Sequence, residues 1–331
     1  MKKVLISRFC AYGDAIHFSH LPRLLKDQGF DQVDVETNFK GFQLLQNNPF
    51  IDNLIFFEPT NNLALYSTSD RIQKHWKIVS KGYDKFINLF ETIEKACISS
   101  EHDNEYYMHE KNRESYKHIN YYNQSTIDAG YPELVDKYKG EVYFTEQEHH
   151  IAKRYIDKYD GKFTIMINLN GTTLHKKMIF APELTQRLID KYPECRIILT
   201  GDKSSSEIAD KICSSDNVIS VIGRVPFRQA MLMSKYCNLV ISMESGFGVG
   251  ANMWETPTIQ LMTAASLENH PNGCKNDFSL QSPAYCSPCN KGPYRFIGCP
   301  HKDGYPMCIY FDVDKIMNRV EEAYELTFTK N

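Results

Sequence analysis

Short apolar runs alternate with amphipathic segments along most of the chain. The apolar runs are rich in Val, Ile, Leu and Phe, which is typical of buried strands. They lie at 4–9, 33–37, 53–58, 86–90, 163–169, 196–201, 217–223 and 238–242. Between them, apolar residues recur at helical spacing, as at 184–192, 205–213 and 227–236. Strands and helices that alternate in this way predict right-handed βαβ units and parallel sheets.

The alternation occurs twice, once on each side of Asp160-Gly161, and 331 residues suffice for about two domains. We therefore expect one α/β domain at 1–158 and a second at 159–331. Ligands of such domains bind at the carboxyl ends of the strands, so we expect the site in a cleft between the two. Pro22 lacks the N–H that continues a helix and predicts a kink or a fresh helix start, and Gly29 predicts the end of that helix.

Residues 91–145 break the alternation, because they are rich in Tyr, Asn, His and Glu and only weakly periodic. Five tyrosines fall in this stretch: Tyr106, Tyr107, Tyr116, Tyr121 and Tyr122. Two interpretations stay open. The tyrosines belong either to surface helices or to a face that binds an acceptor, since loops on a rigid scaffold often carry specificity.

Composition and charge exclude several classes of protein. The 42% of hydrophobic and 24% of charged residues do not suit a largely disordered chain. Lys and Arg number 38 against 41 Asp and Glu, and a net charge of -3 does not suit a generic polyanion binder. No run approaches the roughly 18 apolar residues of a membrane span. The N-terminal MKKVLISRF fits a strand better than a signal peptide, so we expect a cytoplasmic protein.

Five of the ten cysteines crowd between Cys274 and Cys308. Four of them, Cys286, Cys289, Cys299 and Cys308, follow the spacing C-x2-C-x9-C-x8-C in a segment with several Gly and Pro. Four thiolates with one CxxC pair can close a tetrahedral site for zinc or iron. The alternative is a set of buried thiols without metal. A metal with four protein ligands would be structural, since no coordination position stays open for catalysis.

Asp14 follows the first predicted strand at a Gly13-Asp14 turn. The carboxylate serves either as a helix cap, which is common for Asp, or as a reactive group at the mouth of the cleft.

Two loops in the second half could bind a phosphate. The loop after the strand at 163–169 contains Gly171-Thr172-Thr173 followed by Lys176 and Lys177. It supplies hydroxyl groups, backbone N–H groups and positive charge, although a solvated loop is equally consistent with it. The turn Glu244-Ser245-Gly246-Phe247-Gly248 joins a strand to an apolar helix, whose N-terminus favours an anion. Glycines for close packing would explain this turn as well.

Taken together, these segments resemble the ADP-heptose:lipopolysaccharide heptosyltransferases, family nine of the glycosyltransferases, over nearly the whole chain. The family's opening Gly-Asp-x-Ile-His and Leu-Pro read here as 13–17 and 21–22, and its Asn-Pro-x-Ile/Val-Asp passage matches 48–52. Its Thr-x-x-x-Lys donor loop matches 173–177, and the run into its Asp-Thr-Gly turn matches 217–246. The order and spacing of these motifs are more specific than any one of them.

The resemblance implies a GT-B fold, in which two Rossmann-like domains bind the acceptor and the nucleotide sugar respectively. It also assigns roles to residues. Asp14 is the expected catalytic base, and His17 orients it or shares that role. The expected donor-binding residues are Thr172, Thr173, Lys177, Glu244, Ser245 and Gly246. The donor is expected to be an ADP- or UDP-sugar, and the chemistry needs no catalytic cofactor.

This chain departs from the family pattern at two positions. The family's Asp-Thr-Gly is Glu244-Ser245-Gly246 here, and the His that follows it is replaced by Val249. Heptose is therefore only one of the sugars that the expected inverting transferase could move.

Several acceptors are consistent with the sequence. A lipopolysaccharide or other envelope glycan follows from the resemblance and would place the protein at the inner face of the membrane. A protein side chain is suggested by the cysteines, because a similar knuckle occurs in an iron-containing branch that heptosylates autotransporter proteins. A modified nucleic-acid base would suit a phage-encoded enzyme in the host cytoplasm, although 91–145 shows no basic run. The alternative from another class is a non-catalytic protein that binds sugar nucleotides.

Overall fold

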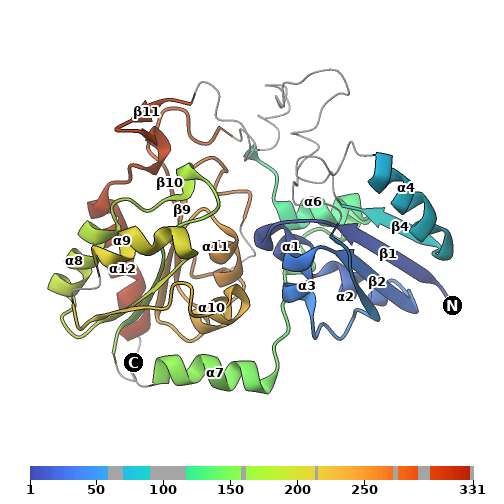
Figure 1. Ribbon diagram of the computed structural model, residues 1–331, viewed down its shortest axis with the longest axis horizontal. Coiled ribbons are helices and arrows are strands. Elements are labelled where there is room, and N and C mark those ends of the chain that lie inside the picture. Colours follow the sequence, from blue (N-terminus) through green and yellow to red (C-terminus); the bar gives the residue numbers. More distant parts are fainter. Residues whose placement is uncertain are drawn as a thin grey trace. The chain divides into compact units, whose positions relative to one another are not determined.

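The computed structural model describes residues 1–58, 70–89, 117–157, 162–212, 215–270, 275–289 and 299–328. Contacts within the chain divide these residues into two units, each with its own parallel sheet (Figure 1). The first unit comprises Met1–Phe144 and the short segment 268–270, and the second unit comprises the other described residues. The chain thus leaves the first unit after Phe144 and returns to it after Leu267.

The first unit is built on a four-stranded parallel sheet in the order β3-β2-β1-β4. Its strands are β1 (Lys3–Arg8), β2 (Gln32–Thr37), β3 (Asn53–Phe56) and β4 (Lys85–Asn88). Its helices are α1 (Tyr12–Phe18), α2 (Leu21–Asp27), α3 (Phe39–Leu45), α4 (Asp70–Val79) and α6 (Tyr121–Asp128). The predicted fresh helix start is confirmed, because α2 begins at Leu21 with Pro22 in its first turn. Gly29 follows that helix with a φ of 81°, a conformation that glycine adopts without strain.

The second unit is built on a six-stranded parallel sheet in the order β10-β9-β8-β5-β6-β7. Its strands are β5 (Thr164–Asn168), β6 (Arg196–Thr200), β7 (Val218–Ser220), β8 (Leu239–Met243), β9 (Thr258–Met262) and β10 (Leu280–Gln281). Its helices are α7 (Glu146–Ile156), α8 (Ala181–Lys191), α9 (Ser206–Asp210), α10 (Phe227–Ser234), α11 (Gly246–Ala251) and α12 (Val313–Phe328). A short hairpin joins β11 (His301–Lys302) to β12 (Tyr305–Pro306).

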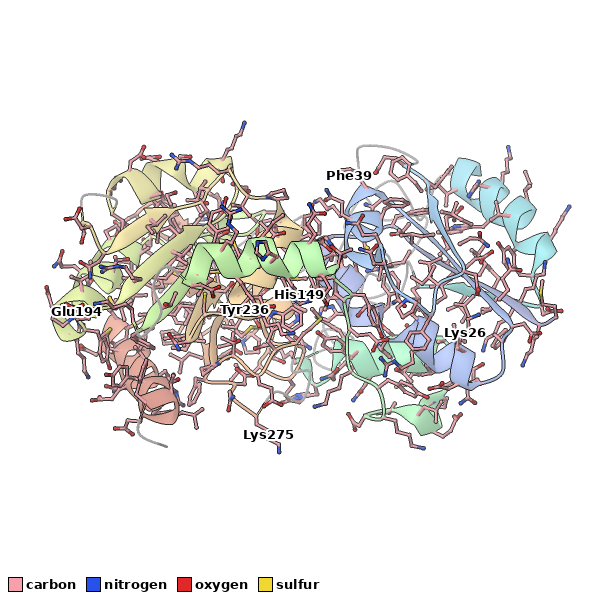
Figure 2. The ribbon with its side chains drawn as sticks, turned by 90° about the horizontal axis from the view of Figure 1, so that it is seen from below. Lys26, Phe39, His149, Glu194, Tyr236 and Lys275 are labelled. Carbon is pink, nitrogen blue, oxygen red and sulfur yellow. The ribbon has the colours of Figure 1, made fainter. Side chains whose placement is uncertain are left out.

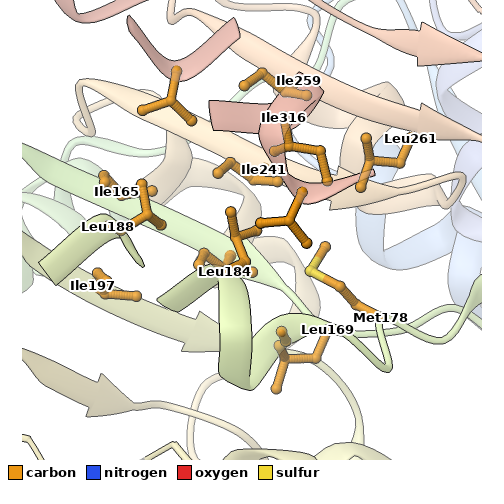
Figure 3. Close-up of a cluster of buried hydrophobic side chains, with 14 of the residues drawn as sticks. Ile165, Leu169, Met178, Leu184, Leu188, Ile197, Ile241, Ile259, Leu261 and Ile316 are labelled. Atoms are coloured by element: carbon orange, nitrogen blue, oxygen red, sulfur yellow. The ribbon is translucent and has the colours of Figure 1, made fainter. Parts of the chain in front are cut away.

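One face of the second sheet packs against α8 and α12 to form a core of aliphatic side chains (Figure 3). Ile165 and Ile241 on the central strands meet Leu188 of α8 and Ile316 of α12, and all four are fully buried. Burying one such side chain stabilises the fold by about 1.5–3 kcal/mol. This core sets the carboxyl ends of β5 and β8, and with them the loops that carry the candidate donor residues.

Helix α7 packs within the second unit, and this places the boundary at Thr145 instead of the predicted 158/159. The guanidinium of Arg228 on α10 forms a 2.6 Å ion pair with Glu148 of α7. His149 on the next position of α7 hydrogen-bonds the hydroxyl of Tyr236 at 2.5 Å (Figure 2). The amphipathic helix therefore covers the second unit, where the sequence pattern alone had suggested a terminal helix of the first.

Tyr121 and Tyr122 lie on α6 and are buried, so these two tyrosines do not belong to a surface face. Tyr106, Tyr107 and Tyr116 lie outside the described residues, and their assignment stays a prediction. In the part of the chain that the structure describes, no helix is both long and apolar enough to cross a bilayer.

Candidate functional site

Asp14 lies in the first turn of α1, directly after β1. One of its carboxylate oxygens accepts a 2.9 Å hydrogen bond from the backbone N–H of Ala11, the residue that precedes the helix. The other oxygen lies 3.8 Å from the buried guanidinium of Arg8. A quarter of the Asp14 side chain (25%) stays exposed. Asp14 therefore caps the helix from inside its first turn, and it also presents a carboxylate to solvent beside a fixed positive charge.

His17 lies one turn after Asp14, with both ring nitrogens inside the protein. Its Nε2 is 3.1 Å from Nδ1 of His270, and the two rings are stacked with centroids 5.2 Å apart. Its Nδ1 is buried without a hydrogen-bond partner among the described residues. Burial first, and then the charge of His270, lower the pKa of His17 well below its usual 6.5, so the ring is neutral near pH 7. The hydrogen bond of His17 goes to His270 rather than to Asp14.

The predicted donor loop follows β5 and contains a short 3-10 turn at Leu174–Lys176. Thr172 is exposed, and the hydroxyl of Thr173 lies 3.0 Å from Nδ1 of His175. His175 is buried, and burial followed by the charge of Lys176 lowers the pKa of its imidazole to about 4. The loop therefore presents a threonine at its surface and holds a neutral histidine beneath it.

The two adjacent lysines of this loop have different surroundings. The ammonium group of Lys176 lies 3.5 Å from the carboxylate of Glu244. Lys177 forms no ion pair with any residue that the structure describes, and its side chain is partly exposed. Its positive charge contributes to lowering the pKa of Asp202, although hydrogen bonds from Ser204 and Asn170 contribute more. Of the two lysines, Lys177 has the charge that a donor phosphate could use.

The turn Glu244-Ser245-Gly246 joins β8 to α11. Ser245 is the N-cap of α11 and lies 3.2 Å from the amide oxygen of Asn168 at the end of β5. The carboxylate of Glu244 is buried and accepts three hydrogen bonds from Thr263 and Ala265 in the loop after β9. Thr263, Ala265 and Asn168 were not predicted as site residues, because their positions at or after strand ends are the only sequence signal that points to them.

The segment that contains Cys286 and Cys289 contacts the same loop after β9. The backbone N–H of Cys289 donates to the carbonyl of Ala264 at 3.1 Å. Burial raises the pKa of the Cys308 thiol to about 12, and Cys289, Cys299 and Cys286 add to this effect. Among the described residues, no group of three or more His, Cys, Asp or Glu side chains is arranged to hold a metal ion, so the metal stays a prediction.

Solved structures with the same architecture were found by comparison of the whole chain. A glycosyltransferase of family 9 from Veillonella parvula superimposes with a TM-score of 0.72 at 12% identity, covering 97% of both chains. The E. coli ADP-heptose LPS heptosyltransferase II gives a TM-score of 0.63 at 13% identity over 98% of both chains. The predicted GT-B fold is thus confirmed.

A third GT-B neighbour is the iron-containing dodecameric glycosyltransferase TibC from enterotoxigenic E. coli, with a TM-score of 0.61 at 13% identity. The match covers 98% of this chain and 77% of TibC. No protein-family sequence model matches the chain, and no curated protein sequence matches it. The likeness is therefore one of fold, and function has to be argued from the residues of each unit.

Proposed function

We propose that this protein is an inverting glycosyltransferase that moves a sugar from a nucleotide-diphosphate sugar to an acceptor hydroxyl. The observation that supports it most directly is that, in a chain with the GT-B fold, a partly exposed aspartate follows β1 of one unit, and a lysine without an ion pair among the described residues follows β5 of the other. Neighbours of this fold include two structures of the E. coli heptosyltransferase WaaC, one with ADP and one with ADP-2-deoxy-2-fluoro heptose. An ADP-sugar is accordingly the first donor to test, and an envelope glycan is the first acceptor.

The second unit would bind the donor. Lys177 would neutralise the diphosphate, and the hydroxyl groups of Thr172 and Thr173 would donate hydrogen bonds to it. A positive charge at this position stabilises the transition state, because negative charge builds on the leaving nucleoside diphosphate as the bond from the anomeric carbon to the phosphate oxygen breaks.

The first unit would supply the base. Asp14 would take the proton of the acceptor hydroxyl while the hydroxyl oxygen attacks the anomeric carbon from the side opposite the leaving group. His17 is a weaker candidate for this step, because its Nε2 is engaged with His270 and its Nδ1 is buried. We propose that His17 holds α1 in place and thereby orients Asp14.

Lys177→Ala tests the donor site. A charge-assisted hydrogen bond contributes about 1.5–3 kcal/mol, so we expect donor affinity to fall about 10- to 100-fold and turnover to fall with it. Isothermal titration calorimetry with ADP- and UDP-sugars measures the affinity. Lys315→Ala removes an exposed lysine from α12 and is the matched control. Unchanged affinity and turnover in Lys177→Ala would place the phosphate loop elsewhere, with Lys176 as the next candidate.

A non-catalytic sugar-nucleotide-binding protein is the alternative that this experiment leaves open. Slow hydrolysis of the donor, measured as release of ADP or UDP, separates the two, because only an enzyme activates the anomeric carbon. Hydrolysis that is lost in Lys177→Ala and kept in Lys315→Ala would favour the transferase.

We also propose a structural zinc or iron ion at Cys286, Cys289, Cys299 and Cys308. The spacing of the four cysteines, with one CxxC pair, supports it, since four thiolates can close a tetrahedral site for either metal. The iron of the neighbour TibC is consistent with this proposal.

Elemental analysis of protein purified without added metal should find about one zinc or iron per chain. Cys286→Ser should lower the content well below one, whereas Cys195→Ala, at a buried cysteine of the core, should leave it unchanged. A stable and fully active protein without metal would contradict the proposal.

A further inference from the structure

Glu244 occupies the first position of the turn that we expected to bind the donor, yet its carboxylate is turned into the protein. We propose that Glu244 is a positioning residue, which holds the loop 263–265 and the ammonium group of Lys176 in place and does not contact the donor sugar. This inference rests on the proposed function of the second unit and names the role of one residue in it.

The N–H side of the loop 263–265 is bound by Glu244. One carboxylate oxygen accepts hydrogen bonds from the backbone N–H of Thr263 at 2.9 Å, its hydroxyl at 3.0 Å, and the N–H of Ala265 at 2.9 Å. Only 5% of Glu244 is exposed, so water does not replace these bonds when they are lost. Each buried donor left without an acceptor costs about 1–3 kcal/mol.

The carbonyl side of the same loop is bound by the segments that follow it. The carbonyl of Thr263 accepts from the hydroxyl of Ser287 at 2.7 Å, and that of Ala264 accepts from the N–H of Cys289 at 3.1 Å. Gln281 donates to the carbonyl of Ala265 at 3.1 Å and to the hydroxyl of Ser287 at 2.8 Å. Both the N–H groups and the carbonyl groups of the loop are therefore hydrogen-bonded, and Glu244 is the charged residue that binds the N–H groups.

The second carboxylate oxygen of Glu244 faces Lys176 at 3.5 Å. Gly171 makes room for the lysine stem, because a Cβ at this position would lie 2.8 Å from the Cδ of Lys176. Glu244 thus holds the charge of Lys176 close to the β8 turn and leaves Lys177 as the lysine of this loop without an ion pair in the described structure. An aspartate is shorter by one methylene and would not reach both the loop and Lys176 from the same backbone position.

Hydrogen–deuterium exchange tests the hold on the loop without any ligand. In Glu244→Ala, the amides of Thr263 and Ala265 should exchange at least about tenfold faster, since their acceptor is gone. Glu244→Gln keeps one oxygen acceptor and should stay close to the wild-type rate, which also guards against a failure of the alanine variant to fold. Wild-type exchange of both amides in a folded Glu244→Ala would overturn the inference.

Binding of ADP and ADP-glucose, or of UDP and UDP-glucose if those bind better, tests the role. Loss of positioning in Glu244→Asp should weaken binding of the free nucleotide and of the sugar nucleotide by the same factor, within about twofold. A loss confined to the sugar nucleotide would mean that Glu244 contacts the sugar, and it would overturn the inference while leaving the proposed function intact. If the wild-type protein binds none of these nucleotides, the proposed function fails, and the exchange experiment still decides whether Glu244 holds the loop.

Discussion

Asp14→Asn should lower the rate of glycosyl transfer by about 10²–10⁴-fold, the usual contribution of general-base catalysis. The variant keeps an oxygen that accepts the N–H of Ala11, so α1 should remain capped and the free energy of unfolding should stay close to the wild-type value. It loses the carboxylate that takes the acceptor proton. Donor binding should be unchanged, because the donor residues belong to the second unit.

The measurement is transfer to an envelope-glycan acceptor, or hydrolysis of the sugar nucleotide while that acceptor is being identified. Asp14→Ala is the companion variant. It also removes the capping interaction, and it should therefore lose about 1 kcal/mol of stability in addition to activity. Activity of Asp14→Asn within a few-fold of wild type would show that Asp14 only caps the helix. His17 would then be the leading candidate for the base.

Eight of the ten strands that the structure describes in the two parallel sheets could be predicted from the sequence, because they are short apolar runs that alternate with helices, whereas β9 and β10 were not predicted. The four strands of the first unit and the four at β5, β6, β7 and β8 all lie within a few residues of the predicted runs. The boundary between the units could not be predicted. An amphipathic helix such as α7 indicates that one face is buried, but it does not say against which unit.

Only those residues of the candidate site that come directly after a strand could be proposed from the sequence. Asp14 lies in the first turn of the helix that follows β1, and Lys177 and Glu244 lie in the loops after β5 and β8. All three are at the carboxyl ends of strands, where ligands of parallel sheets bind. Their partners were not predictable, since His270 lies 253 residues from His17 and Thr263 lies 19 residues from Glu244. Adjacent lysines are equivalent in a sequence pattern. In the folded protein the two lysines differ, because the 3-10 turn that ends at Lys176 brings the ammonium group of Lys176, and not that of Lys177, close to Glu244.

Both units should lose stability steeply as the pH falls from about 6.5 to about 5, because each contains buried neutral histidines. Burial lowers the pKa of His20 to about 3 and that of His175 to about 4, and the pKa of His17 is also far below 6.5. In the unfolded chain these rings bind a proton below about pH 6.5, whereas the folded chain does not bind it until the pH approaches 4 or lower. The unfolded state therefore gains protons first, and the free energy of unfolding falls with falling pH.

Each such histidine contributes about 1.4 kcal/mol per pH unit within this window, so His175 alone should cost the second unit about 2 kcal/mol by pH 5. Urea unfolding at pH 7.5, 6.5, 5.5 and 5.0, followed separately for each unit, measures the slope. His175→Gln should flatten the slope for the second unit, and the slope for the first unit, which does not contain this residue, should stay unchanged. Asp202 and Glu148 have lowered pKa values and add to the loss only below about pH 4.5, outside this window. Equal stability at pH 7.5 and 5.0 would mean that these histidines are hydrated or already protonated in the folded protein. His17 would then again be a candidate for the group that accepts or donates the proton during catalysis.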